Sequence, residues 1–493
     1  MKVLGIGGIL SNETACAAVI RGKLVAAVEQ KKIPELSAIA ECLRIASLQP
    51  SEIEAVSVAR PVDEATLKNL RVQFPNAGFT QVDHHQAHAA SAFFASGFKD
   101  AKVLTIDGGN DLTSARSWNA SGTTLTGERE MLWPDSIGEV YSRVTELLGF
   151  KRRADEHKVQ WMSTAGDDRY VGAFREILGS PWGHLKASEN LREVLGLESD
   201  EPVPSHLRIH IAAGIQRAVE QYAVDLVEPA QNICLAGGVF FNVLLVHAFE
   251  KAGKWKNVFV QPAAGNTGTA IGAAYSVSSA PIVPMSTLAL GPEYSPEEIK
   301  KVLENCKLNF RFLLTTDDIL NAALRLLSEN KILAWMQGRM EFGPRALGNR
   351  SILASPLDPY SSVNLNAYIK HRQDFRKFAA AVPAEHVAEF FEVGPNAKFL
   401  ATVGKVRPEH RKTFEAAILG QDLIRLHVVE QSENPLFHRL LVEFGKKTNI
   451  PVLYNTSFNL FGDPLVCTPR DAVRSFYSSG IDGLVAGNFL LEK

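Results

Sequence analysis

Short apolar runs that end near glycine or aspartate recur along the chain, and longer stretches of mixed polarity separate them. The clearest runs cover residues 3–6, 103–106 and 233–236. Residues 136–148 and 209–227 instead space their apolar positions as one face of a helix. Because strand-like and helix-like segments alternate, the pattern predicts α/β layers.

A break in composition divides the chain near residues 276–292, where Ser, Pro and Met crowd together. The length of 493 residues exceeds what one core usually serves. Beyond the break, Ser295 precedes Pro296-Glu297-Glu298, which is typical of an N-cap and an acidic first helical turn. We therefore predict two domains, covering residues 1–282 and 283–493.

Composition narrows the class of protein. The chain is 46% apolar and 22% charged, as soluble globular proteins are, and its net charge of −2 gives no field toward nucleic acid or an anionic membrane. The five cysteines are scattered without a CxxC pair, which disfavours disulfides and thiolate zinc sites. No signal peptide or membrane-spanning run is recognisable. We expect a cytoplasmic protein with no nucleic-acid or membrane partner.

A pair of histidines suggests a metal site in the first half. His84 and His88 are four residues apart, so on a helix they share one face, whereas His85 points elsewhere. Asp107 follows the run 103–106 and precedes Gly108, at the strand end where α/β folds bind ligands. The alternatives are histidines that only make core or surface hydrogen bonds, and an Asp-Gly pair that only forms a turn.

Two glycine-rich turns extend this constellation. Gly237 and Gly238 follow the run 233–236, and without Cβ atoms their backbone can approach a nucleotide. Residues 262–272 form a second such loop. With the histidine pair and Asp107, they predict a nucleotide site with a metal. The GxxxxGK[ST] and GxGxxG spacings are absent, which argues against a P-loop enzyme and a Rossmann dehydrogenase.

Basic residues dominate the second half's candidate site. Arg339, Arg345 and Arg350 lie among glycines in residues 338–351, and guanidinium groups suit phosphate or carboxylate. The alternatives are a solvated basic face or a nucleic-acid surface. Because the net charge is slightly acidic, we favour a small anion pocket. Further candidates follow in two runs: Lys370, Arg372, Phe375, Arg376, Lys377 and Phe378, then Asn455, Thr456, Ser457 and Asn459.

Together these motifs resemble those of the nodulation-factor, cephem and aminoglycoside O-carbamoyltransferases. The resemblance covers nearly the whole chain and is carried by residues 338–351, 370–378 and 455–468, with residues 136–150 and Glu156-His157-Lys158-Val159 in support. It implies an actin-like ATPase fold, similar to that of tRNA threonylcarbamoyl-transferring proteins, for the first domain. It implies a YrdC-like α/β fold for the second.

The resemblance also implies a reaction. Carbamoyl phosphate and ATP would give carbamoyl adenylate, and the carbamoyl group would pass to a hydroxyl of a small acceptor, such as a sugar or antibiotic. A divalent iron, zinc or manganese ion would assist, and a homodimer is left open. The implied metal ligands are His84, His88 and Asp107. The implied nucleotide contacts are Asp107, Gly108, Lys158, Gly237, Gly238, Asn242 and Asn266. The implied carbamoyl phosphate and triphosphate contacts are Arg345, Arg350, Lys370, Arg372, Arg376, Asn455 and Ser457.

The chain departs from the family pattern in three places. Asn266 stands where the family has an aspartate that completes the metal site, and a neutral amide is a weaker ligand for a hard cation. Asn12 and Glu13 replace a His-Asp pair, and asparagine cannot accept a proton at neutral pH. The run 29–32 replaces Glu-Glu-Arg. All three departures fall on the predicted acceptor side, so a degenerate homologue that acts as an accessory subunit is an alternative function. A tRNA-modifying enzyme is a further alternative.

Overall fold

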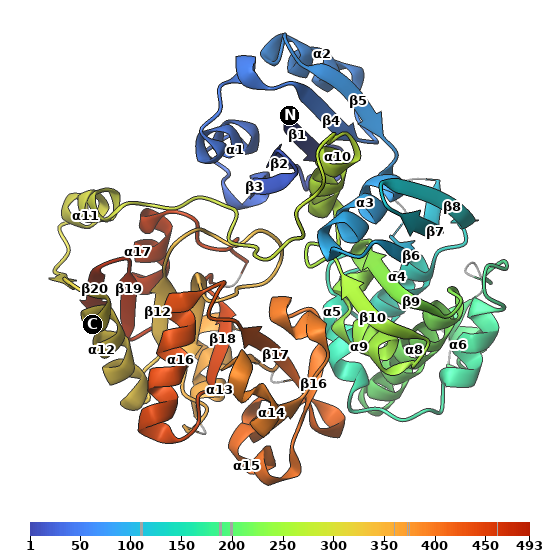
Figure 1. The fold of residues 1–493 in the computed structure, drawn as a ribbon. Helices are drawn as coiled ribbons and strands as arrows, with labels where there is room; N and C mark the ends of the chain where they lie inside the picture. Colours follow the sequence, from blue (N-terminus) through green and yellow to red (C-terminus); the bar gives the residue numbers. More distant parts are fainter. Residues whose placement is uncertain are drawn as a thin grey trace. The chain divides into compact units, whose positions relative to one another are not determined.

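The chain folds into two compact units (Figure 1). Unit 1 comprises Met1–Ala27 and Cys42–Met285, and unit 2 comprises Val28–Glu41 and Ser286–Lys493. The composition of Val28–Glu41 does not indicate that this early segment belongs with the second unit. The computed structural model describes residues 1–108, 112–186, 190–197, 201–358, 360–371, 373, 375–460 and 462–493.

The described residues of unit 1 form two five-stranded sheets with the same topology. In one, the order is β3-β2-β1-β4-β5; in the other it is β10-β9-β6-β7-β8. In each, the first strand lies centrally, antiparallel to the second and parallel to the fourth. The strands are β1 (Lys2–Gly7), β2 (Ala15–Ile20), β3 (Lys23–Glu29), β4 (Ala55–Ala59), β5 (Gly78–Val82), β6 (Asp100–Ile106), β7 (Thr113–Ser121), β8 (Thr124–Leu132), β9 (Ala230–Ala236) and β10 (Trp255–Val260).

Two small-residue helices pack closely beside these sheets. Helix α10 (Thr269–Ser276) contacts both β1 and α3 (His84–Ser96). A Cβ at Gly272 would overlap the carbonyl oxygen of Ala87, so glycine is needed for this approach. The other helices that begin in unit 1 are α2 (Glu64–Gln73), α4 (Ile137–Leu147), α5 (Glu156–Ser163), α6 (Val171–Leu178), α7 (Leu191–Val194), α8 (Ser205–Asp225) and α9 (Val243–Lys251).

The helices and strands predicted from periodicity are confirmed with small shifts at their ends. Ser136 caps α4 by accepting from the backbone N–H of Glu139 at 3.1 Å. Ser295 and Glu298 form the capping box of α11 (Pro296–Asn305). Both caps satisfy backbone N–H groups that a helix leaves without partners in its first turn. Among the described residues, none of the helices combines the length and the apolar character needed to cross a bilayer.

Unit 2 is built on one mixed sheet of ten described strands, in the order β11-β20-β19-β12-β13-β18-β14-β17-β16-β15. Apolar side chains cover both faces, with Trp335 and Phe437 on one and Phe378 and Phe476 on the other. The strands are β11 (Arg311–Phe312), β12 (Leu333–Met336), β13 (Arg350–Ala354), β14 (Ala379–Pro383), β15 (Phe391–Glu392), β16 (Val403–Val406), β17 (Leu423–Val429), β18 (Leu453–Ser457), β19 (Gly483–Ala486) and β20 (Phe489–Glu492).

Helices flank this sheet on both faces, because each face carries its own apolar cluster. Helices α12 and α16 supply one cluster, and α11 and α17 supply part of the other. The helices not yet placed are α1 (Ala38–Ala46), α12 (Thr316–Ser328), α13 (Ser361–Asn364), α14 (Val387–Phe390), α15 (Arg411–Phe414), α16 (Pro435–Thr448) and α17 (Pro469–Tyr477), and a π-helical turn covers Leu365–Lys370.

Gly237 allows the ends of β9 and β6 to meet, so its replacement should destabilise unit 1. Its φ is +102°, and a Cβ there would overlap the carbonyl oxygen of Ile106. We expect Gly237→Ala to cost about 2–4 kcal/mol in urea unfolding. Gly172 of α6 is the control, because a Cβ there meets nothing within 4 Å and Gly172→Ala should be neutral or stabilising. A native midpoint for Gly237→Ala would contradict this account.

Candidate functional site

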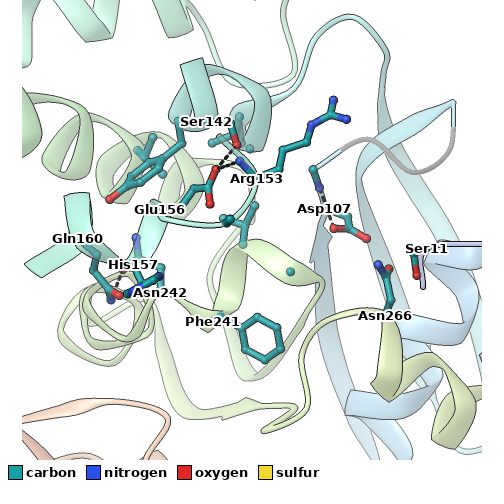
Figure 2. A pocket seen from close by; sticks show the side chains of 18 of the residues that line it. Ser11, Asp107, Ser142, Arg153, Glu156, His157, Gln160, Phe241, Asn242 and Asn266 are labelled. Carbon is teal, nitrogen blue, oxygen red and sulfur yellow. Dashed lines mark hydrogen bonds between the residues drawn. The ribbon is translucent and has the colours of Figure 1, made fainter. Parts of the chain in front are cut away.

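A cavity of about 510 Å³ opens in unit 1 where several of the predicted residues gather (Figure 2). Its walls come from the turn between β1 and β2, the end of β6, the helices α4 and α5, and the turns that follow β9 and β10. The lining includes Asp107, Gly108, Gly238, Asn242 and Asn266, all of which are predicted nucleotide contacts.

The three predicted metal ligands lie together at this cavity. His84 and His88 occupy the first turns of α3, and Asp107 directly follows β6. The Nε2 atoms of His84 and His88 lie 2.7 and 3.4 Å from Asp107 Oδ2. Their candidate ligand atoms all lie within 4.8 Å of one another, and all three side chains are buried. The shared face of α3 that the spacing predicts is therefore present.

The electrostatics of this cluster suit a divalent cation. Burial lowers the pKa of His88, and thus favours the neutral imidazole that a metal requires. Burial acts to raise the pKa of Asp107, but hydrogen bonds and charges from His84 and His88 outweigh it and hold that pKa well below its usual range. Within the described residues, Nδ1 of His88 finds no hydrogen-bond partner. An ionised carboxylate beside two imidazoles is a donor set for iron, zinc or manganese.

His85 bonds to neighbouring strands and not to Asp107, which fits the prediction that it points elsewhere than His84 and His88. Its Nε2 donates to the carbonyl oxygen of Thr113 at 2.8 Å, and its Nδ1 lies 2.8 Å from the hydroxyl of Thr105. Burial lowers its pKa to about 4, so the ring is neutral at physiological pH. His85 therefore ties α3 to β6 and β7 and leaves the cluster to its neighbours.

The glycine turn after β9 closes one side of the cavity. A Cβ at Gly238 would lie 3.0 Å from Asp107 Oδ1, so only glycine leaves that carboxylate its space. Asn242 caps α9, and its Oδ1 accepts from Gln160 at 2.8 Å while its Nδ2 donates to Gln216 at 2.8 Å. The amide of Asn242 is thus held rigidly at the cavity wall.

Lys158 lies elsewhere than the prediction implies. It is absent from the cavity lining, its ammonium group pairs with Asp155 at 2.9 Å, and it lies over the ring of Phe150. Glu156 and His157, which precede Lys158 in α5, line the cavity instead, because the rotation along the helix directs Lys158 away from it. Residues that the sequence did not assign to the site also line the cavity: Tyr141, Ser142, Arg153, Glu156, His157 and Gln160. Ile137, Gly138, Tyr141 and Ser142 recur at helical spacing, a signal that was readable.

In unit 2, two of the predicted anion-binding arginines bind the protein's own backbone. Arg350 is fully buried, and its guanidinium donates to the carbonyl oxygens of Gln337 at 2.8 Å and Gly338 at 3.1 Å. Arg339 donates to the carbonyl oxygen of Gly291 at 3.2 Å. The loop needs these donors because its glycine-rich backbone is in neither helix nor sheet. The contact of Arg350 with carbamoyl phosphate or the triphosphate stays a prediction.

The glycine-bearing loop does wrap an anion, but the anion is its own Glu341. The Oε1 atom of Glu341 accepts from the backbone N–H groups of Leu347 at 2.7 Å, Asn349 at 2.9 Å and Arg350 at 3.2 Å. Lys32 adds its ammonium group, which donates to the carbonyl oxygen of Glu341 at 3.0 Å. The run 29–32, expected on the acceptor side of the first domain, therefore belongs to unit 2 and supports this loop.

Lys370 and the turn after β18 form the remaining candidate anion site. Lys370 is 6% exposed and donates to the carbonyl oxygen of Ser457 at 2.5 Å and to Asn459 Oδ1 at 2.7 Å. Asn455 Nδ2 donates to the carbonyl oxygen of Ala346, next to the half-buried Arg345, at 3.1 Å. Arg376 is half-buried shortly before β14, and Arg372 lies outside the described residues.

A small cavity of about 30 Å³ in unit 2 is lined by Glu341 and His427, and we expect the buried imidazole of His427 to make folding stability depend on pH. Burial lowers the pKa of His427 from 6.5 to about 3. Because the unfolded chain takes up this proton first, folding stability should fall as pH drops below 6.5, by about 1.4 kcal/mol per pH unit until about pH 3. We expect His427→Gln to show a shallower decline in urea unfolding between pH 7 and 4.5, and exposed His206→Gln to keep the native slope. Equal slopes for native and His427→Gln would refute this.

Comparisons with known proteins identify the family of the chain. Residues 58–275 match the family model for the carbamoyltransferase N-terminus, and residues 324–493 match that for the carbamoyltransferase C-terminus. Nodulation protein NolO of Bradyrhizobium diazoefficiens is 33% identical, over 84% of this chain and 79% of that protein. Nodulation protein U of Rhizobium tropici is 32% identical, over 94% and 91% respectively.

Among solved structures, component A of (R)-2-hydroxyglutaryl-CoA dehydratase from Acidaminococcus fermentans gives a TM-score of 0.38 at 19% identity. That likeness covers 56% of this chain and 96% of the other. The two family models and the nodulation proteins extend over both units, so the assignment rests on them. The chain belongs to the carbamoyltransferase family, whose enzymes are ATP-dependent.

Proposed function

We propose that this chain is an O-carbamoyltransferase that activates carbamoyl phosphate with ATP and carbamoylates a hydroxyl of a small acceptor. The observation that carries the proposal is the buried cluster of His84, His88 and Asp107 beside the 510 Å³ cavity. A cavity of this size suits a nucleotide or a sugar-sized acceptor. In each turnover, carbamoyl phosphate, ATP, one water and the acceptor would give the carbamate ester, AMP, pyrophosphate and phosphate.

Unit 1 would carry the transfer step. His84, His88 and Asp107 would hold the divalent metal, which when bound would offset phosphate charge and orient the nucleotide. Gly237 and Gly238 would admit the nucleotide's polar groups close to the backbone. The repeated sheet topology supports an actin-like fold for this unit, with one β-sheet core in each half.

Unit 2 would carry the activation step, in a YrdC-like domain that we place at residues 283–493. Lys370 and Arg345 would hold the anionic groups of carbamoyl phosphate and ATP, with Ser457 and Asn455 as neutral hydrogen-bonding partners. A buried ammonium group stabilises negative charge that develops on departing phosphate more strongly than an exposed one does. Because the Lys370 ammonium already bonds to Ser457 and Asn459, it is fixed before a ligand arrives.

The experiment measures nucleotide turnover. Purified protein is incubated with ATP and carbamoyl phosphate in the presence of Fe²⁺, Mn²⁺ or Zn²⁺, and AMP, pyrophosphate and phosphate are quantified by ³¹P NMR. We expect release of AMP and pyrophosphate that depends on carbamoyl phosphate and increases with a panel of aminoglycoside and sugar acceptors. Absence of turnover with every metal would overturn the proposal.

A second candidate is a degenerate carbamoyltransferase that serves as an accessory subunit. The presence of Asn266 in the cavity wall, where the family pattern has an aspartate, favours it. This candidate predicts ligand binding without turnover by the isolated protein. Carbamoyl transfer by the isolated protein, with near one equivalent of metal, would exclude it.

A further inference from the structure

Asn266 lines two cavities that border the metal-ligand cluster. It lines the larger cavity with Asp107 and a smaller one, of about 70 Å³, with His84. His84 and Asp107 are themselves joined at 2.7 Å, so both cavities that Asn266 lines also border the pair that they form. Figure 2 shows the Asp107 carboxylate and the Asn266 amide pointing toward each other. The Asn266 side chain is therefore placed to contact a cation held by the cluster.

Glu13 determines which end of the Asn266 amide can do so. Asn266 Nδ2 donates to Glu13 Oε2 at 2.8 Å. An ionised carboxylate only accepts hydrogen bonds, so this contact assigns the nitrogen of the amide to Glu13. The oxygen is then the only atom of the amide that can act as a ligand for a cation.

The backbone of Glu13 is fixed by the tight turn between β1 and β2. Its N–H donates to the carbonyl oxygen of Gly8 at 3.2 Å, and the hydroxyl of Ser11 donates to the same oxygen at 3.0 Å. Gly8 and Asn12 adopt φ of +68° and +57°, which suits glycine and asparagine. The side chain that reaches Asn266 thus starts from a rigid point.

We propose that Glu13 is a positioning residue of the metal centre and acts through Asn266. The Glu13 carboxylate orients the Asn266 amide so that Oδ1 faces the cation. Through its hydrogen bond to Asn266, it also supplies the negative charge that a neutral amide lacks. Carboxylates play the same part behind metal-bound histidines, where they orient the ligand and raise its basicity. The inference rests on the metal-binding part of the proposed function, and it explains how asparagine at position 266 remains compatible with that function.

The test measures affinity for Mn²⁺ alone, by electron paramagnetic resonance titration of the full-length protein, and therefore needs no activity. Glu13→Gln keeps the length of the side chain and one acceptor oxygen, but its amide is neutral and can also donate; we expect it to bind Mn²⁺ about 10–100-fold more weakly. Glu13→Asp, one methylene too short, should behave alike. Glu64→Gln, on the exposed first turn of α2, is the matched control and should bind as the native protein does.

A double variant that exchanges the charges of positions 13 and 266 distinguishes the loss of Asn266 positioning from a general loss of structure. The double variant Glu13→Gln/Asn266→Asp moves the carboxylate from position 13 to position 266, and we expect its Mn²⁺ affinity to return to within about threefold of native. Native affinity in Glu13→Gln, or no recovery in the double variant, would overturn the inference while leaving the proposed function standing. Failure of the native protein to bind Mn²⁺, Fe²⁺ or Zn²⁺ would overturn the metal-binding part of the function and the inference with it.

Discussion

Asp107→Asn is expected to weaken Mn²⁺ binding at least about 100-fold and to abolish carbamoyl transfer. Asp107 is the only carboxylate in the described cluster, and both histidine Nε2 atoms lie within 3.4 Å of its Oδ2. Its replacement by a neutral amide leaves two buried imidazoles with no negative charge to offset a divalent cation. Metal affinity is measured by titration, and transfer by the release of AMP.

Asp100→Asn is the matched control, because Asp100 begins the same strand β6 but is exposed at the opposite end. It removes the same charge from the same sheet, so it should retain native metal binding and turnover. The result that would sink this account is Asp107→Asn with native Mn²⁺ affinity and an intact fold by circular dichroism. Binding would then depend on groups other than this cluster.

Lys370→Met is expected to lower pyrophosphate release driven by carbamoyl phosphate at least about 100-fold. Lys370 is buried and connects the π-helical turn Leu365–Lys370 to Ser457 and Asn459. Methionine preserves much of its volume but removes the cation from the candidate anion site. Because several acceptors lose their donor, we also expect a loss of about 1–3 kcal/mol in the free energy of unfolding.

The controls separate chemistry from folding. Lys405→Met changes an exposed lysine of β16 and should leave turnover unchanged. Mn²⁺ affinity of Lys370→Met should also stay native, since the metal cluster lies in the other unit, which has its own core. Turnover equal to native in Lys370→Met would remove Lys370 from the activation step.

The metal cluster could be predicted because its determinants are local. Four-residue spacing places His84 and His88 on one helix face, and Asp107 directly follows β6, whose parallel neighbour β9 ends at the same edge of the sheet. Gly237 and Gly238 could be predicted for the same reason, since the pair directly follows β9. Such residues can be predicted without knowledge of distant parts of the chain.

Residues whose roles depend on distant partners could not be predicted. The buried Arg350 donates to Pro292 and Gln337, and sequence alone does not reveal which carbonyl oxygens lack partners. The direction of Lys158 depends on how α5 is rotated against the cavity. The duplicated topology of unit 1 leaves no repeat in the sequence, because sheet order is set by packing and tolerates many residue choices.

The loop around Glu341 has its conformation fixed when the protein folds. The backbone N–H groups of Leu347, Asn349 and Arg350 bond to Glu341, and Nη1 of Arg350 and the ammonium of Lys32 bond to backbone carbonyl oxygens within unit 2. A ligand that arrives therefore does not have to order this segment, and binding loses little conformational entropy there. The internal carboxylate also repels any second anion from those N–H groups. We therefore expect phosphate to bind the cations at the margin of the loop and not the N–H groups in its interior.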